Sequence, residues 1–212
     1  MNRKNLVLLG GGGHCHSVIE SIEQCENFSI AGILEPPPNK VELISGYPVI
    51  GTDDAIPELV AKGMSFFITV GHIKNPLPRR KLFDLLKSNN APVVSIIDPA
   101  ASVSKRSVIG EGTVILRHAF VNAGARIGHN CIINTGAMVE HDSIVGNHTH
   151  ISTGAIVNGD CTVGDNCFIG SGAVLSNNIS ICSDVIIGAG SVVLWSLTEP
   201  GTYLGNPARL IK

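Results

Sequence analysis

The chain has 212 residues, enough for one or two domains that each bury a core. Its formal net charge is -2 and only 15% of its residues are charged, which argues against a surface that binds nucleic acid or an anionic membrane. No apolar stretch approaches the roughly 20 residues of a membrane helix, and the apolar run after Arg3 and Lys4 is too short for a signal peptide. We therefore expect a cytoplasmic protein without nucleic-acid or membrane partners.

Residues 1–98 alternate apolar runs with helix-like segments, a pattern typical of βαβ units around a small parallel sheet. The apolar runs are residues 5–9, 30–34, 65–70 and 93–97. A helix is expected to begin near His16 or Ser17 and to end before Asn27. We predict an α/β, Rossmann-like N-terminal domain over residues 1–98.

The first apolar run ends in a glycine turn, residues 10–13, followed by His14. A strand that leads through such a turn into a helix brings backbone N–H groups close to an anion, and the helix dipole favours the negative charge. Glu35 ends the second run, where a carboxylate can accept hydrogen bonds from ribose or base, and Gly71 follows the third run on the same sheet edge.

These features suit a nucleotide, although two alternatives stay open. The turn lacks the third glycine of the dinucleotide fingerprint, and a domain of this size is about half of a dinucleotide fold, which disfavours NAD. A glycine turn that serves only tight strand-to-helix packing is the structural alternative. The candidates for nucleotide binding are Gly12, Gly13, His14, Glu35 and Gly71.

A six-residue period governs the chain from Val103 to Val193, where sixteen consecutive positions six apart are all Val, Ile or Leu. Four places later in each hexad, thirteen of fifteen residues are Ser, Thr, Ala or Cys, the exceptions being Ile179 and Val185. A fixed period of this kind indicates a solenoid. We predict a parallel β-helix with both positions facing inward, and fifteen hexads make five coils if each coil has three sides.

The second domain is expected over residues 99–212, beginning after the seam at Asp98 and ending in a loop and cap from Thr198. Three of the six cysteines occupy the small inward position of the hexads, so they are interpreted as reduced packing residues. No C-x-x-C pair argues for a zinc site.

Five of the eight histidines lie in the repeat, and the period helps to choose among them. If one coil is eighteen residues, His141 lies between Ala123 and Gly159, two small residues that leave its imidazole open to a ligand. Asp142 could bond one ring nitrogen and so fix the tautomer. His150, nine residues on, could close over the same pocket, while a histidine at a solvated corner can also be only a polar turn residue.

The motifs together resemble a known family. The run INTGAMVEHD at residues 133–142, residues 150–152, Asn158-Gly159 and the closing GNPAR at residues 205–209 are similar to the hexapeptide-repeat acetyltransferases. With the turn at residues 12–14, the chain most resembles their sialic acid O-acetyltransferase and nucleotide-amino-sugar N-acetyltransferase subgroup. This resemblance implies a left-handed β-helix and a homotrimer, with acetyl-CoA in the groove between neighbouring β-helices.

The resemblance also implies roles for individual residues. His141 would be the general base, Asp142 its partner, and His150 a contact to the acetyl thioester. The residues that match the path of CoA are Gly159, Ser171 and Ala189, and those that match the nucleotide-sugar pocket are Gly12, Gly13, His14, Glu35 and Gly71. No metal is implied.

We expect direct transfer of an acetyl group to the amine of a nucleotide-linked sugar, such as a 4-amino-4,6-dideoxy sugar, in bacterial surface-glycan biosynthesis. A neutral imidazole, with a reference pKa of about 6.5, suits the removal of the acceptor's proton. O-acetylation of a sialic-acid-type sugar is the first alternative. A zinc-dependent carbonic anhydrase-like trimer using His148 and His150, or a scaffold without catalysis, are the others.

Overall fold

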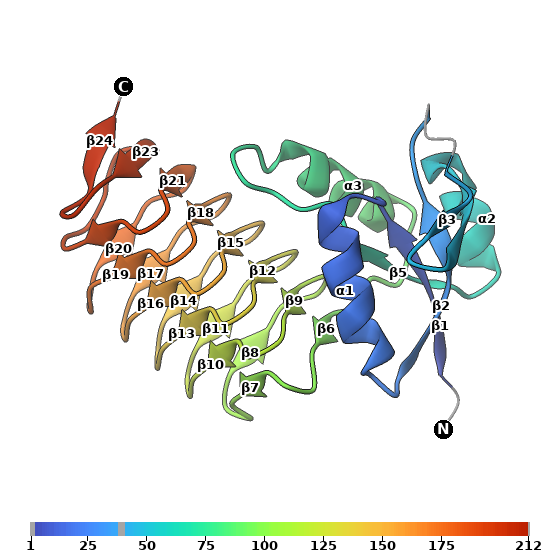
Figure 1. The fold of residues 1–212 in the computed structure, drawn as a ribbon, viewed down its shortest axis with the longest axis horizontal. Coiled ribbons are helices and arrows are strands. Elements are labelled where there is room, and N and C mark those ends of the chain that lie inside the picture. The colour runs from blue at the N-terminus through green and yellow to red at the C-terminus, as the bar shows by residue number, and fades with distance from the viewer. Residues whose placement is uncertain (1–2, 38–40, 212) are drawn as a thin grey trace.

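The structure is a computed structural model that describes residues 3–37 and 41–211. Its N-terminal part contains β1 (Lys4–Leu9), α1 (Gly13–Glu23), β2 (Phe28–Leu34), β3 (Leu43–Ile44), β4 (Tyr47–Gly51), a 3-10 turn (Asp53–Ala55), α2 (Ile56–Ala61), β5 (Ser65–Ile68) and α3 (Leu77–Ser88). The five strands form one sheet in the order β3-β4-β2-β1-β5, with β1, β2, β4 and β5 parallel (Figure 1). This is the α/β domain that the alternating pattern predicts.

Three details of this domain differ from expectation. The helix α1 begins at Gly13 rather than near His16, because the first-turn N–H groups of a helix have no internal partner and glycine is tolerated there. The fourth apolar run does not form a strand of this sheet: Val93 makes only an isolated bridge to Phe66. The hairpin of β3 and β4, which turns at Ser45 with φ of 47°, was not predicted.

The C-terminal part is a β-helix of three parallel faces. Face 1 consists of β7 (Ser102–Val103), β10 (Phe120–Val121), β13 (Met138–Val139), β16 (Ile156–Val157), β19 (Val174–Leu175) and β22 (Val192–Val193). Face 2 consists of β8 (Val108–Ile109), β11 (Arg126–Ile127), β14 (Ile144–Val145), β17 (Thr162–Val163) and β20 (Ser180–Ile181). Face 3 consists of β6 (Ile96–Ile97), β9 (Val114–Ile115), β12 (Ile132–Ile133), β15 (His150–Ile151), β18 (Phe168–Ile169), β21 (Val185–Ile187), β23 (Gly201–Leu204) and β24 (Arg209–Ile211).

The strand register confirms a coil of eighteen residues with three sides. Ile133 pairs with Ile115 on one side and with Ile151 on the other, and the other coils repeat this spacing. From Ile115 to Val193 these inward side chains are buried, as are the small residues from Thr113 to Ser191, whereas Val103 and Ile109 of the first coil are partly buried. Ile179 and Val185 also face inward, at 6% and 0% exposure. The parallel β-helix predicted from the hexads is therefore confirmed.

Three rows of turns join the faces, and we name them by the faces they connect. Edge 1–2 contains residues 122–125, 140–143 and 158–161; edge 2–3 contains residues 110–113, 128–131 and 146–149; edge 3–1 contains residues 116–119, 134–137, 152–155, 170–173 and 188–191. Edge 1–2 is thus the edge that does not touch face 3. Many turns contain a residue in the left-handed region, such as Asp142 with φ of 59°, a conformation that Asn, Asp and Gly adopt at low cost.

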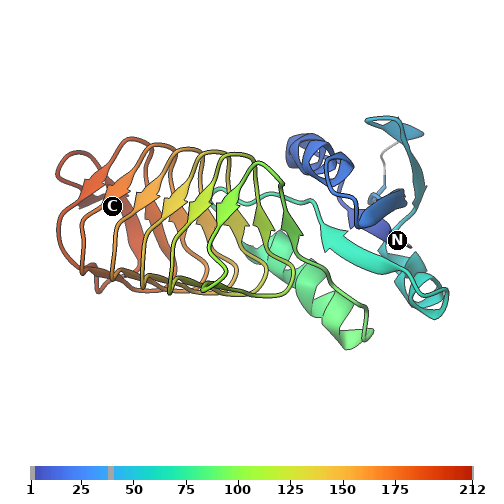
Figure 2. The same ribbon diagram turned by 90° about the horizontal axis from the view of Figure 1, so that it is seen from below.

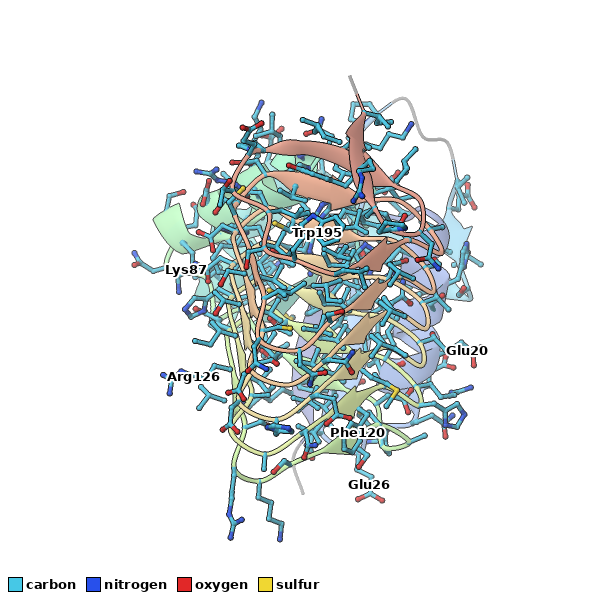
Figure 3. The ribbon with its side chains drawn as sticks, turned by 90° about the vertical axis from the view of Figure 1, so that its left-hand side faces the viewer. Glu20, Glu26, Lys87, Phe120, Arg126 and Trp195 are labelled. Carbon is cyan, nitrogen blue, oxygen red and sulfur yellow. The ribbon has the colours of Figure 1, made fainter. Side chains whose placement is uncertain are left out.

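The N-terminal domain covers the first coils of face 3. In Figure 1 the β-helix extends away from it to the C-terminus, and Figure 2 shows α3 running beside the first coils. Helix α1 lies at edge 3–1, where the Ser21 hydroxyl donates to buried Asp98 at 2.6 Å. Helix α3 lies at edge 2–3, where Lys87 pairs with Glu111 at 2.9 Å. Seen along the β-helix in Figure 3, Glu20 of α1 and Lys87 of α3 accordingly lie on opposite sides.

The C-terminal segment is more regular than the predicted loop and cap. β23 adds to face 3 beside β21, and β24 returns antiparallel to it. Tyr203 and Ala208 are buried against the last coil and close the interior. Among the described residues, no helix has the length and apolar character needed to cross a membrane.

Candidate active site

A cavity of about 480 Å³ lies where the N-terminal sheet meets face 3. It is lined by residues 10–14, 35–36, 69–73, Asn134 and His150, and we name it the glycine-turn pocket. All five predicted nucleotide-binding residues, Gly12, Gly13, His14, Glu35 and Gly71, line this pocket. The carboxyl edge of the parallel strands therefore brings them together, as such edges do in open α/β sheets.

The glycine turn presents an open helix N-terminus to the pocket. Gly12 is the N-cap of α1 and has no side-chain cap, and a Cβ at Gly12 or Gly13 would meet nothing within 4 Å. Free N–H groups at a helix N-terminus suit an anion. Glu35 accepts a hydrogen bond from the N–H of Gly11 and so fixes the start of the turn.

Two histidines in the pocket are held neutral by burial. Burial, with a smaller contribution from the nearby Arg79, lowers the pKa of His14 to about 3. Among the described residues, His14 Nε2 has no hydrogen-bond partner although it is buried. Burial likewise lowers the pKa of His72 to about 3. A neutral imidazole at His14 can donate or accept one hydrogen bond to a ligand in this pocket.

His150 points from face 3 into the same pocket, and both of its ring nitrogens have partners within the chain. Nδ1 lies 2.5 Å from the carbonyl oxygen of His72, so it carries the proton and donates. Nε2 lies 3.0 Å from the Asn134 amide nitrogen and accepts. Burial lowers the pKa of His150 to about 4. The imidazole is therefore neutral, with its tautomer fixed by these two contacts.

His141 lies on edge 1–2, and its neighbours are those that the eighteen-residue coil predicts. Its ring lies over Gly159, where a Cβ would stand only 2.6 Å from Nε2. Asp142 accepts a hydrogen bond from Nδ1 at 3.0 Å and raises the pKa of His141. Gly124 leaves the space that the Asp142 carboxylate occupies. With Nδ1 engaged, the exposed Nε2 is the nitrogen available to take a proton.

Within one chain the predicted residues separate into two groups. Ser171 and Ala189 lie on edge 3–1, on the side of the glycine-turn pocket, whereas His141, Asp142 and Gly159 lie on edge 1–2. The expectation that His150 closes over the same pocket as His141 is therefore not met within one protomer, because His150 lies on face 3 and is buried beneath the N-terminal domain.

His148 and His150, the pair considered for a zinc site, do not converge either. His148 lies on edge 2–3 and contacts Asn130 at 3.0 Å, away from the partners of His150. Within residues 3–37 and 41–211, no group of three or more His, Cys, Asp or Glu side chains is arranged to hold a metal ion. The pocket also contains His72 and Asn134, which were not predicted as site residues, although His72 directly follows the predicted Gly71.

Comparisons with known proteins agree with this architecture. Residues 5–86 match the family described as the PglD N-terminal domain, and residues 142–177 and 160–194 match the bacterial transferase hexapeptide repeat. Among known proteins, UDP-N-acetylbacillosamine N-acetyltransferase of Bacillus subtilis (strain 168) is 36% identical over 117 residues, which are 53% of this chain. The match spans about half, 51%, of that curated relative.

Solved structures match the whole chain. PerB from Caulobacter crescentus, solved with CoA and GDP-perosamine, is 34% identical with a TM-score of 0.91, covering 98% of this chain and 97% of PerB. The acetyltransferase domain of PglB from Neisseria gonorrhoeae FA1090 is 30% identical with a TM-score of 0.89, covering 99% of this chain and 100% of that domain.

A hexapeptide β-helix with a nucleotide-type domain on its first coils and an exposed His–Asp pair defines a hexapeptide-repeat acyltransferase. The full-length matches narrow this class further. The chain belongs to the family of PglD-type acetyl-CoA-dependent sugar N-acetyltransferases. The family resemblance found in the sequence is thus confirmed.

Proposed function

We propose that this chain transfers the acetyl group of acetyl-CoA to the amine of a nucleotide-linked amino sugar, a 4-amino-4,6-dideoxy sugar being the expected class. The observation that carries the proposal is the His141–Asp142 pair, which leaves an exposed Nε2 above Gly159. A relative supports it: the GDP-perosamine N-acetyltransferase of Caulobacter crescentus has been solved as its H141A mutant with CoA and GDP-perosamine.

The chemistry needs one base and an open approach. The sugar nitrogen attacks the thioester carbonyl carbon, the carbon–sulfur bond breaks, and CoA leaves as the thiol once it has gained a proton. His141 Nε2 takes the proton that the amine loses, and Asp142 stabilises the imidazolium that forms. Because its hydrogen bond to Asp142 raises the pKa of His141, the imidazole becomes a stronger base.

The glycine-turn pocket is the proposed site of the nucleotide sugar. Its open α1 N-terminus suits the diphosphate, and Glu35 with Gly71 borders the space on either side. The pocket and His141 lie on different edges of one protomer, so a single chain does not hold a complete site. A second copy must bring His141 to the pocket.

A homotrimer around face 1 would complete the site. From β10 onward the outward side chains of that face are apolar and partly buried: Phe120, Met138, Ile156, Val174 and Val192. Face 2 is more polar, with Arg126 pointing away from the β-helix in Figure 3. If three copies pack through face 1, edge 1–2 of one chain faces edge 3–1 of the next. His141 then meets the neighbour's glycine-turn pocket, and CoA runs past Gly159 on one chain and Ser171 and Ala189 on the other.

Mixed trimers test this arrangement. One chain carries His141→Ala and the other Gly12→Trp, which fills the pocket from a position where the backbone has room. Each variant alone should be inactive, while co-expressed chains that assort at random should recover about a quarter of the wild-type sites. If the site lay within one chain, no activity would return.

Thiol release identifies the reaction. Purified protein with acetyl-CoA is offered UDP-, GDP- and dTDP-linked 4-amino sugars beside free sialic acids. Turnover with an amino-sugar nucleotide, lowered about 100-fold or more by His141→Ala, supports the proposal. Turnover only with sialic acids would replace it by O-acetylation. We place the reaction in the cytoplasm, since all six cysteines are free, as in a reducing compartment.

A further inference from the structure

Arg79 is a buried cation that the proposed reaction does not use. It lies near the start of α3, is 1% exposed, and shares the inward stripe of that helix with Phe83 and Leu86. An apolar side chain is the ordinary occupant of such a stripe. Among the described residues, Arg79 pairs with no carboxylate. Burial lowers its pKa to about 9, which still leaves the guanidinium charged at neutral pH.

The guanidinium joins the N-terminal domain to the β-helix through four main-chain carbonyl groups. Nη1 donates to the carbonyl of Ile68, the last residue of β5, at 2.5 Å and to that of Val70, two residues further on, at 2.9 Å. Nε donates to Asn130 and Nη2 to Gly112, both at 3.2 Å. Those two residues stand eighteen apart, in successive coils of edge 2–3, and both have left-handed φ values. Four of the five donors of the fork are therefore used.

The carbonyl of Ile68 ends β5, and that of Val70 lies within residues 69–73, the pocket loop, which lines the glycine-turn pocket. The same loop is held from the other side, because the carbonyl of His72 accepts the hydrogen bond of His150. Alternate carbonyls at Ile68, Val70 and His72 are thus fixed by two side chains of different elements. Gly71 stands between Val70 and His72 and packs closely against His14. A Cβ added at Gly71 would lie only 3.2 Å from the Cβ of His14.

Lysine cannot replace this arrangement, because a compact ammonium does not reach carbonyls on both sides as the planar fork does. The charge of Arg79 has a second effect that does not depend on the fork: it lowers the pKa of His14 and of His72. A lysine would keep most of that effect. The two substitutions Arg79→Lys and Arg79→Met therefore separate the hydrogen bonds from the charge.

We propose that Arg79 is a positioning residue for the acceptor: its guanidinium fixes the pocket loop against two turns of the β-helix, so that Gly71 and His72 shape the pocket. The identity of the acceptor rests on the proposed function, whereas the hydrogen bonds of Arg79 to the pocket loop and the β-helix do not depend on it. Arg79 itself stays out of contact with the substrate and acts through the loop.

Hydrogen exchange measures the loop without any substrate. In Arg79→Lys and Arg79→Met, amides of residues 69–73 should exchange about tenfold or more faster, while β1 and the later coils of the β-helix keep their protection. The matched control is Arg80→Met, the next residue, whose side chain is 47% exposed and lies 3.9 Å from Asp84; it should leave the loop unchanged. Wild-type exchange in the Arg79→Lys loop, or equal loosening of the whole domain, would overturn the proposal.

Steady-state kinetics give the second readout. Both Arg79 variants should raise KM for the amino-sugar nucleotide about tenfold or more, with KM for acetyl-CoA within about twofold of wild type. A purely structural residue would lower the amount of folded enzyme and leave both KM values unchanged, which would refute positioning. If the wild-type enzyme turns over no amino-sugar nucleotide, the proposed function fails, while the exchange experiment still decides the role of Arg79.

A measurement on the wild-type chain remains if both variants fail to fold. With arginine labelled by nitrogen-15, a guanidinium held by four carbonyls should show slowly exchanging, separately resolved Nη protons at neutral pH. Free rotation and fast exchange of every arginine side chain would contradict the geometry on which the proposal stands.

Discussion

Gly159→Ala tests whether the proposed base must lie where the structure places it. Gly159 has an ordinary backbone conformation, so alanine causes no backbone strain there. Its Cβ, however, would stand 2.6 Å from His141 Nε2 and 2.7 Å from Cε1. The imidazole must retreat by about 0.8 Å to reach ordinary contact at 3.4 Å. A displacement of about 1 Å in a reacting group costs on the order of 100-fold in rate.

The assay is kcat for acetyl transfer at saturating acetyl-CoA, with the chemical shifts of His141 followed by NMR in the same variant. The matched control is Gly63→Ala, a remote turn glycine with φ of 76° and open space around it. That substitution strains the backbone by about 1 kcal/mol and should lower stability but not kcat. Wild-type kcat in Gly159→Ala, together with an imidazole that has moved, would refute the assignment of His141 as base.

Asp142→Asn removes the main cause of the raised pKa of His141, so the acidic limb of the kcat/KM profile should move to lower pH while kcat falls; a profile unchanged in both would contradict the pairing. The pKa of His150 is about 4 when folded and about 6.5 when unfolded, so the unfolded chain takes up the proton first. The free energy of unfolding should therefore fall between about pH 6.5 and about pH 4, by roughly 3 kcal/mol from this group, and urea denaturation of His150→Gln at fixed protein concentration should show a shallower fall. Met138→Asp on face 1 should dissociate the proposed trimer in sedimentation, whereas Ile144→Asp on face 2 should not; equal behaviour of the two would argue against face 1 as the interface.

The β-helix was predictable because its rule is repeated fifteen times. Each coil buries the same kind of side chain at the same place, so packing selects the residue type with little help from distant parts of the chain. The period then placed His141 between Ala123 and Gly159, and the structure confirms both neighbours. The N–H of Asp142 donates a hydrogen bond to the carbonyl of Ala123, and the His141 ring covers Gly159. The prediction that the fourth apolar run joins the N-terminal sheet was wrong, because apolar character alone does not indicate which sheet a strand joins.

The arrangement of the two domains was not predictable, because single long-range contacts fix it. Arg79 and Arg80 look alike in the sequence, and only the spacing of Arg79 from Phe83 and Leu86 marks it as the inward one. The partners of Arg79 are carbonyl groups, which every residue carries, so no sequence pattern signals them. His150, nine residues after His141, was considered as a residue that could close over the same pocket, but nine residues are half a coil, which on a three-sided helix leads to another face.

Because His141 and the glycine-turn pocket lie apart within one chain, the proposed function depends on the interface between subunits of the proposed trimer. Edge 1–2 is the edge opposite face 3. The N-terminal domain covers face 3 because the outward residues Val114 and Ile132 of that face are apolar and buried beneath it. His141 therefore cannot approach the glycine-turn pocket of its own chain without unwinding a coil. In the proposed trimer a neighbour supplies His141 at no conformational cost, since both surfaces are already formed on the β-helix. In that proposed assembly the groove would close only when the subunits associate, so that water is excluded and the base is positioned in the same step.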